Sequence, residues 1–138
     1  MITVSKACIC KPSEIMLFAC SGGGSNVGQI ANNAALEMTK EGKAKMYCLA
    51  GLGGHVPGII EAAKQAKKII VIDGCPVLCA KKIVEHAGLK VDELVVVTDE
   101  NIEKTPGVFD IKDEEIIKIK SLIESKINRD VENTMAEG

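Results

Sequence analysis

The chain has 138 residues, of which 46% are hydrophobic and 26% are charged, as in ordinary globular domains. Its net charge of −2, its single arginine (Arg129) and its shortage of aromatic side chains argue against the basic, base-stacking surface that nucleic-acid binding needs. No apolar run approaches the roughly 20 residues of a membrane-spanning helix, and the first residues lack the apolar core of a secretion signal. We therefore expect a cytoplasmic protein whose partners include neither nucleic acid nor a membrane.

The chain begins with an arm over residues 1–13, which carries Cys8 and Cys10 ahead of the first predicted strand. Four apolar runs then predict strands. Three of them are near-continuous aliphatic stretches, as expected where both faces of a sheet are covered, whereas the second is shorter and more mixed, like an edge strand. The strands are expected at Ile15 to Ala19, Lys45 to Leu49, Ile69 to Ile72 and Leu94 to Val97.

Helical patterns follow the strands, each with apolar side chains at the spacing of one helix face. Proline, acidic or small polar residues mark their starts, and glycines mark two of their ends. The helices are expected from Ser25 or Asn26 to Gly42, from Pro57 to about Ala66, from Pro76 to Gly88, and from Asp113 through Ile127. Residues 133–138 form a polar tail that we expect to be frayed.

Strands and helices alternate along the chain, and this order predicts a parallel sheet with right-handed crossovers and helices on both faces. We therefore expect one α/β domain over residues 14–132. It should have three layers, a Rossmann-like or flavodoxin-like arrangement, and a mostly parallel four-stranded sheet in the order 2-1-3-4.

Three cysteines recur at nearly equal intervals, each at or just beyond the carboxyl end of a predicted strand: Cys20, Cys48 and Cys75. In the predicted order, the strand before Cys20 lies between the other two, and neighbouring strands are about 4.8 Å apart. Thiolates bound to one tetrahedral zinc ion lie roughly 4 Å from each other. The three side chains can therefore meet at the carboxyl edge of the sheet, where open α/β sheets bind their ligands.

Cys79 is expected to be the fourth ligand. It follows Cys75 by four positions around Pro76, so Cys75 would be the N-cap of a helix and Cys79 the end of its first turn. The N–H groups and the dipole at that end of a helix favour thiolates. Reduced thiols in the cytoplasm favour metal or redox chemistry over a disulfide framework. Four thiolates with no open position suit a closed zinc site, although the same ligands also permit an iron–sulfur cluster.

A glycine-rich turn follows the first strand. Its N–H groups and the next helix could bind a small anion, but the turn lacks the lysine of a P-loop and the glycine and acid of a dinucleotide motif. We favour a tight turn that lets the backbone pass close to the metal, with anion binding as the alternative. The turn consists of Ser21, Gly22, Gly23, Gly24, Ser25 and Asn26.

Four further residues are candidates for accessory roles. Cys8 and Cys10 could deliver metal or exchange disulfides with the main site, or they could be ordinary thiols of the arm. His55, in a glycine-rich segment expected to be a flexible loop, is most simply solvated; as a metal ligand or an acid–base group it would act beside the cysteines. Asp73 is expected to cap the helix after the third strand, with a supporting hydrogen bond to a cysteine as the alternative. His86 is interpreted as a surface residue.

Four segments together resemble the DGC-domain family, which is named after its Asp-Gly-Cys motif. They are Phe18 to Gly22, Gly28 to Asn32, Cys48 to Gly54 and Asp73 to Ala80, and the last is the most distinctive. The resemblance extends at least over residues 14–88. It implies zinc binding through four cysteines, which fall on the four residues singled out above. It gives His55, Cys8 and Cys10 no role and supplies no reaction.

The sequence thus predicts a zinc-binding protein whose four-cysteine site serves structure, sensing or metal handling. The alternative is a thiol-redox or iron–sulfur protein that uses the same cysteines, with a small anionic ligand at the glycine-rich turn. A module that binds a protein partner and keeps zinc for structure is also consistent with the pattern. Whether the chain is an enzyme stays open, because no clear general base stands out.

Overall fold

A computed structural model describes the backbone of residues 14–137 and the side chains of residues 14–129. The arm with Cys8 and Cys10 lies outside the described residues. In chain order the elements are β2 (Ile15–Ala19), α1 (Asn26–Lys40), β3 (Lys45–Met46), α2 (Leu49–Gly53), α3 (Pro57–Lys64), β4 (Lys68–Asp73), α4 (Cys79–His86), β5 (Glu93–Val96), the 3-10 helix η1 (Val97–Glu100) and α5 (Asp113–Glu137).

The strands form one parallel sheet in the order β3-β2-β4-β5, which confirms the predicted order 2-1-3-4. At the carboxyl edge, Ala19 of β2 lies opposite Ile72 of β4, and Asp73 of β4 lies opposite Val96 of β5. The segments that follow these three strands therefore leave the sheet side by side. This edge is where the sequence predicts the cysteine site.

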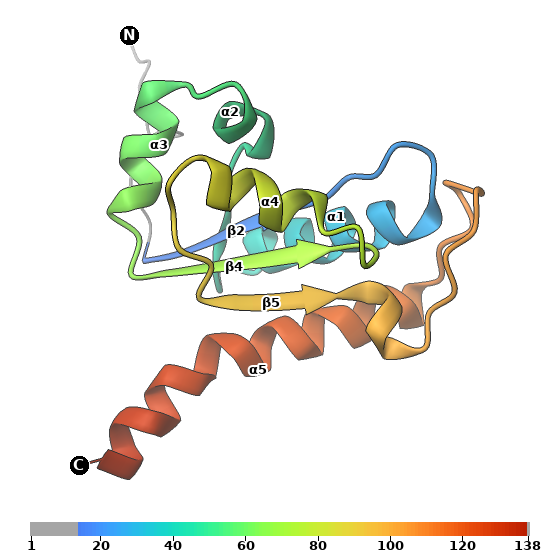
Figure 1. The fold of residues 1–138 in the computed structure, drawn as a ribbon. Coiled ribbons are helices and arrows are strands. Elements are labelled where there is room, and N and C mark those ends of the chain that lie inside the picture. Colours follow the sequence, from blue (N-terminus) through green and yellow to red (C-terminus); the bar gives the residue numbers. More distant parts are fainter. Residues whose placement is uncertain (1–13, 138) are drawn as a thin grey trace, which may run out of the picture.

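Helices cover both faces of the sheet, which confirms the predicted three layers (Figure 1). One core cluster joins α1 and α5 to one face, through side chains such as Ile30 and Ile119. The other joins α2, α3 and α4 to the opposite face, through side chains such as Leu52 and Val84. Every residue of β4 is buried, as expected for a central strand with both faces covered.

The second strand is shorter than predicted, because the chain turns into an additional helix. β3 ends at Met46, and Cys48 is the N-cap of α2, where its Sγ accepts a hydrogen bond from the Gly51 N–H at 3.3 Å. Leu52 is fully buried and anchors this short helix on the core. Most of the glycine-rich segment expected to be a flexible loop is therefore helical.

The third predicted helix begins later than expected. Pro76 is the second residue of a β-turn that the Leu78 N–H closes on the Cys75 carbonyl at 3.1 Å, and α4 begins only at Cys79. The prediction that Cys75 is the N-cap is wrong; that position belongs to Leu78, with φ of 59°. The fixed φ of proline suits both the second position of a turn and the first of a helix, which explains the error.

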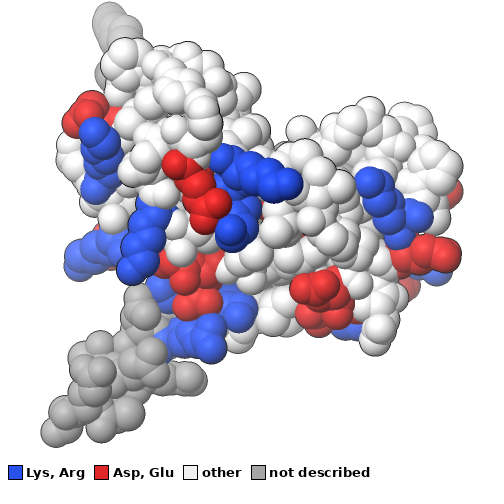
Figure 2. All heavy atoms as spheres, viewed as in Figure 1, with Lys and Arg blue, Asp and Glu red and all other residues white. Residues whose placement is uncertain are grey.

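The other helix boundaries are close to the predicted ones. α1 follows Ser25 as its N-cap and ends before Gly42, which has φ of 76°, and α3 begins at Pro57. α5 begins at Asp113, and its backbone continues through the predicted tail to residue 137. Within the described part of the chain, no helix is both long and apolar enough to cross a bilayer. Acidic and basic side chains are interspersed over the face shown in Figure 2.

Candidate functional site

Three of the four predicted cysteines line one small pocket of about 190 Å³ at the carboxyl edge of the sheet. Cys20 follows β2, Cys75 follows β4, and Cys79 is the first residue of α4. All three are free thiols; Cys20 and Cys75 are half-buried and Cys79 is exposed. Lys104, from the segment between η1 and α5, lines the same pocket. The structure thus brings together residues that are far apart in the sequence.

Cys20 lies in surroundings that disfavour a bare thiolate. Burial raises the pKa of the Cys20 thiol, and the negative charge of Asp73 adds to this rise. The Gly22 N–H, 3.2 Å from Cys20 Sγ, donates a hydrogen bond that opposes it. A cation in the pocket would reverse the balance, because it would supply the positive charge that the buried thiolate lacks.

Asp73 caps α4, as predicted. Its two carboxylate oxygens accept hydrogen bonds from the Ala80 N–H at 2.8 Å and the Lys81 N–H at 2.9 Å. Burial raises the pKa of the Asp73 carboxyl, while these hydrogen bonds oppose the rise. The expectation that free N–H groups of this helix would favour the thiolates is wrong for these two groups, since the carboxylate takes them.

Cys48 is not among the residues that line this pocket. It is exposed, and its Sγ accepts from the Gly51 N–H. The helix that it caps, α2, lies beside α4: a side chain at Gly53 would meet the Ile83 methyl groups at 3.9 and 4.0 Å. These residues lie toward the carboxyl ends of α2 and α4. Helices α2 and α4 are thus packed together, and each begins at or beside a cysteine.

The four thiols have the donor chemistry of a zinc site, but they are not closed around a common centre. Among the residues that the structure describes, no group of three or more Cys, His, Asp or Glu side chains is arranged to hold a metal ion. Four thiolate sulfurs are a common ligand set of structural zinc. Closure around one metal ion would require Cys48, which does not line the pocket, to join the three cysteines that do.

The glycine-rich turn is tight, as favoured from the sequence. Gly22 has φ of 69°, and a Cβ on Gly28 would lie 2.4 Å from the Gly22 Cα, so the start of α1 touches the turn directly. Gly23, Gly24 and Ser25 border an open hollow together with residues 104–106. The turn therefore brings backbone close to Cys20 without side chains that would cover it.

Asn26 is the last residue of the glycine-rich turn, for which anion binding is the alternative prediction. It is buried and hydrogen-bonded to another segment. Its side-chain amide donates to the Glu103 carbonyl at 2.9 Å and accepts from the Thr105 N–H at 2.6 Å. Its own N–H donates to the Thr105 carbonyl at 3.1 Å. Three hydrogen bonds thus fasten residues 103–105 to the start of α1.

Lys104 is a site residue that sequence reasoning missed. Its ammonium lies 3.5 Å from Cys75 Sγ, where it can donate a hydrogen bond to the sulfur. The strand order offers a partial signal, because a segment that follows the fourth strand leaves the sheet next to the end of the third. The strand order does not predict which residue of that segment lies beside the thiols. In the structure, the hydrogen bonds of Asn26 to Glu103 and Thr105 hold this segment, and Lys104 lies between those two residues.

His55 is not among the residues that line the cysteine pocket. Its Nε2 lies 3.1 Å from the Nδ1 of His86, and the two rings are nearly perpendicular. Both residues are exposed, so the surface position expected for His86 is confirmed. The contact between them was not predicted.

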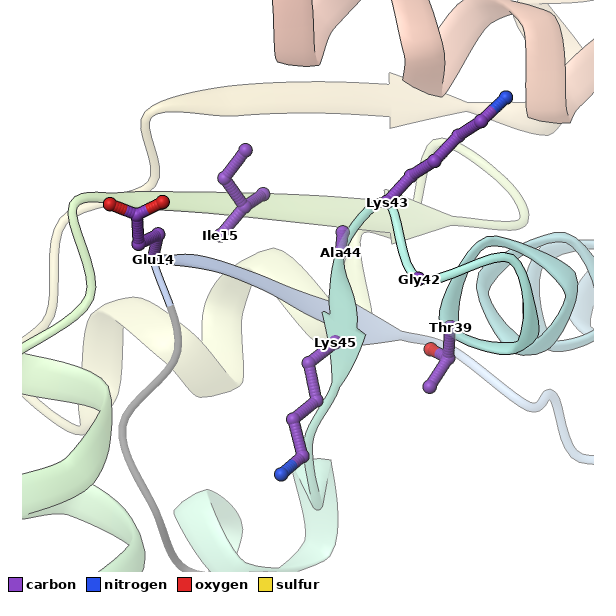
Figure 3. A pocket seen from close by; sticks show the side chains of 7 residues that line it. All are labelled: Glu14, Ile15, Thr39, Gly42, Lys43, Ala44 and Lys45. Carbon is purple, nitrogen blue, oxygen red and sulfur yellow. The ribbon is translucent and has the colours of Figure 1, made fainter.

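A larger hollow of about 450 Å³ lies at the opposite, amino edge of the sheet. Figure 3 shows that the side chains of Glu14, Lys43 and Lys45 point in different directions around it. The Lys43 ammonium contacts Glu41 and Glu124 instead. Because the charged groups do not converge on one point, this hollow is a weaker candidate than the cysteine pocket.

Comparisons with known proteins identify a domain family over most of the chain. The sequence pattern of the DGC domain matches residues 16–123. The anaerobic and virulence modulator AnvM of Pseudomonas aeruginosa is 44% identical over 66 residues, which are 48% of this chain and 50% of that protein. The match thus spans only about half the length of that relative. No solved structure shows a significant match.

Proposed function

The chain belongs to the DGC-domain family, and on that premise we propose that it binds a zinc ion through Cys20, Cys48, Cys75 and Cys79. The observation that supports this most is the pocket at the carboxyl edge, which Cys20, Cys75 and Cys79 line together. The helix pair α2–α4 supports the fourth ligand, because α2 begins beside Cys48 and lies against the helix that begins at Cys79. Zinc would supply the positive charge that offsets the repulsion between these neighbouring thiolates.

The surrounding residues have distinct tasks in this proposal. Asp73 holds the start of α4, and with it Cys79, against the end of β4. Lys104 balances charge: four thiolates around one Zn²⁺ carry a net charge of about −2, which an ammonium 3.5 Å from Cys75 Sγ attracts. The tight turn at Gly22 leaves Cys20 open to the ion.

We place this site in sensing or metal handling rather than in catalysis. The relative AnvM is described as an anaerobic and virulence modulator, which supports a regulatory use of the site. A cytoplasmic location would keep all four thiols reduced and ready to bind metal. A change of metal occupancy would then be the signal, read through the position of α2 against the sheet.

The alternative function uses the same cysteines without zinc, in a thiol-redox cycle or around an iron–sulfur cluster. One observation favours it: Cys20, Cys75 and Cys79 are free thiols beside an ammonium, in a pocket open to small molecules. In this version an anionic ligand would bind at Lys104 and the adjacent hollow.

Metal analysis and a visible spectrum of protein purified without oxygen test the proposal. We expect colourless protein with about one zinc ion per chain. Brown protein with iron and labile sulfide would reject zinc in favour of a cluster. Metal-free protein in which Cys75 and Cys79 form a reversible disulfide would instead establish the redox alternative.

Serine variants test the four ligands one by one. Cys48→Ser should release zinc at a chelator concentration that leaves the wild type loaded, since one thiolate is lost. The matched control is Cys8→Ser/Cys10→Ser, which makes the same change in the arm and should retain zinc. Equal retention in Cys48→Ser and the wild type would remove Cys48 from the site.

A further inference from the structure

The two histidines of the chain meet on the surface, at the carboxyl ends of two packed elements. His86 is the last residue of α4, and His55 follows α2. The ring nitrogens Nε2 of His55 and Nδ1 of His86 are 3.1 Å apart, with ring centroids at 5.1 Å. Both side chains are exposed, so an ion from solvent can reach them without a change in the core.

We propose that His55 and His86 form a second metal site, which binds a late first-row divalent cation such as Zn²⁺ through one nitrogen of each ring. Neutral imidazole is a preferred ligand of Zn²⁺, Cu²⁺ and Ni²⁺. Two nitrogens held at about 2.0–2.1 Å by one tetrahedral zinc ion lie about 3.3–3.4 Å from each other. The observed separation of 3.1 Å is already close to that value, so the two rings need to reorient toward the ion but not to move apart.

The backbone holds the two rings in place. His55 has φ of 55°, a left-handed conformation that costs energy for a residue with a side chain. Its N–H donates to the Leu52 carbonyl at 3.1 Å, which fixes it to the end of α2. The end of α2 lies against α4, since a Cβ on Gly53 would meet the Ile83 methyl groups at ordinary van der Waals distances of 3.9 and 4.0 Å. The two donors are thus presented by packed helices.

Metal binding displaces the hydrogen that lies between the two rings, and the other nitrogen of the same ring can take up a proton in its place. In the neutral pair, one of the two facing nitrogens carries a hydrogen and donates it to the other. For both lone pairs to reach a cation, that hydrogen leaves the facing nitrogen and a solvent proton binds the opposite nitrogen of the same ring. The pair stays neutral and no electrons are exchanged. Water completes the coordination, so the ion is exchangeable.

This inference does not depend on the cysteine proposal, because it concerns different residues at the other end of the α2–α4 pair. The test therefore reads the imidazoles directly. The ring ¹⁵N resonances of both histidines are followed by NMR in the full-length protein while Zn²⁺ is added beyond the amount that its thiols retain. We expect one ring nitrogen of each histidine to shift at the same zinc concentration.

Two variants make the result specific. His55→Asn keeps a residue that tolerates the left-handed backbone, and His86→Gln keeps an amide at the end of α4. Loss of an outer partner of a metal ligand already costs roughly 10–100-fold in affinity, so each variant should raise the zinc concentration at which the remaining histidine shifts by about tenfold or more. Spectra without zinc confirm that both variants are folded.

A control separates ligation from surface charge. Glu85 is next to His86 and is paired with Lys81 at 3.0 Å, so Glu85→Gln removes a nearby charge and keeps both rings. It should leave the joint shift in place. The proposal is overturned if the rings do not shift in excess zinc, if only one shifts, or if Glu85→Gln weakens binding as much as His86→Gln does. Failure of the cysteine site would appear separately, as zinc lost from the wild type with both rings still responsive.

Discussion

At the scale of single residues, Asp73 connects the sheet to the site. Both of its carboxylate oxygens are engaged, by the N–H groups of Ala80 and Lys81, and the residue is 1% exposed. A carboxylate is the side chain that can accept both bonds, since an amide of the same shape has one acceptor and one donor. The position of α4, and of the cysteine at its start, therefore depends on the ionised form of this residue.

We predict that Asp73→Asn destabilises the protein although it removes a buried charge. The new amide would satisfy one N–H and face the other with its own hydrogens, and an unsatisfied buried donor costs about 1–3 kcal/mol. Denaturant unfolding measures the loss. Asp92→Asn is the matched control, because one carboxylate oxygen of Asp92 accepts the Ile69 N–H at 2.7 Å and the amide oxygen of asparagine can keep that bond. Equal stability of Asp73→Asn and the wild type would show that the cap contributes nothing.

At the scale of elements, the start of α1 is pressed against the turn that follows β2. A Cβ on Gly28 would lie 2.4 Å from the Gly22 Cα and 2.5 Å from the Gly22 nitrogen, whose hydrogen is donated to Cys20 Sγ. The contact between helix and turn is thus possible only without a side chain. This contact between Gly22 and Gly28 helps to determine the distance of the Cys20 thiol from α1.

Gly28→Ala should therefore destabilise the fold by about 1–3 kcal/mol, the usual cost of overpacking, and should also weaken zinc retention by displacing Cys20. Thermal unfolding and a chelator titration measure the two effects. Gly58→Ala is the control: Gly58 lies in the first turn of α3, where a Cβ would meet nothing within 4 Å, and alanine is the better helix former by up to about 1 kcal/mol. A stable Gly28→Ala variant would show that the turn can open.

The layer formed by α1 and α5 is also linked by charge. Glu41, the C-cap of α1, contacts Lys120 of α5 and lies 3.4 Å from Lys43. The hydrogen bond from Lys120 is the main cause that lowers the pKa of the Glu41 carboxyl, and Lys43 adds to it. A carboxyl group with a lowered pKa stabilises the folded state only while it is ionised.

Glu41→Gln should accordingly lose stability in a pH-dependent way. The stabilisation is complete above the ordinary glutamate pKa of 4.5 and disappears as the pH falls through the lowered value in the folded protein. Unfolding of both proteins between neutral pH and about pH 3 should show two curves that converge in acid. High salt should narrow the gap at neutral pH, because the pair is exposed. A gap that persists in acid would mean that the mutation acts through packing.

At the scale of the whole molecule, the alternation of strands and helices was sufficient to predict the sheet and its order. The same period placed Cys20 and Cys75 at the ends of neighbouring strands, which the structure confirms. Local rules failed where two conformations suit the same residue. Pro76 fits a turn as well as a helix start, and the glycines after Cys48 did not reveal that Leu52 would anchor a helix.

The order of strands and helices did not predict which residues of distant segments contact each other. Nothing local distinguishes Lys104 from the other lysines of the chain, and its place beside Cys75 depends on which residues Asn26 bonds. The contact of His55 with His86 depends likewise on how α2 packs on α4. Contacts of this kind depend on tertiary packing, and the pattern of a single sequence does not reveal how its helices and strands pack.

The bonds of Asn26 have a consequence for the order in which the protein assembles. They join positions that are 77 and 79 residues apart, so they can form only after every strand of the sheet has been synthesised. A growing chain on the ribosome thus exposes Cys20, and later Cys75 and Cys79, before the segment with Lys104 exists. During that interval the thiols lack the ammonium that borders them in the finished protein. Under the proposed function, capture of a metal ion by the completed pocket would therefore be a late event of biogenesis, and the nascent thiols would be open to competing reactions until then.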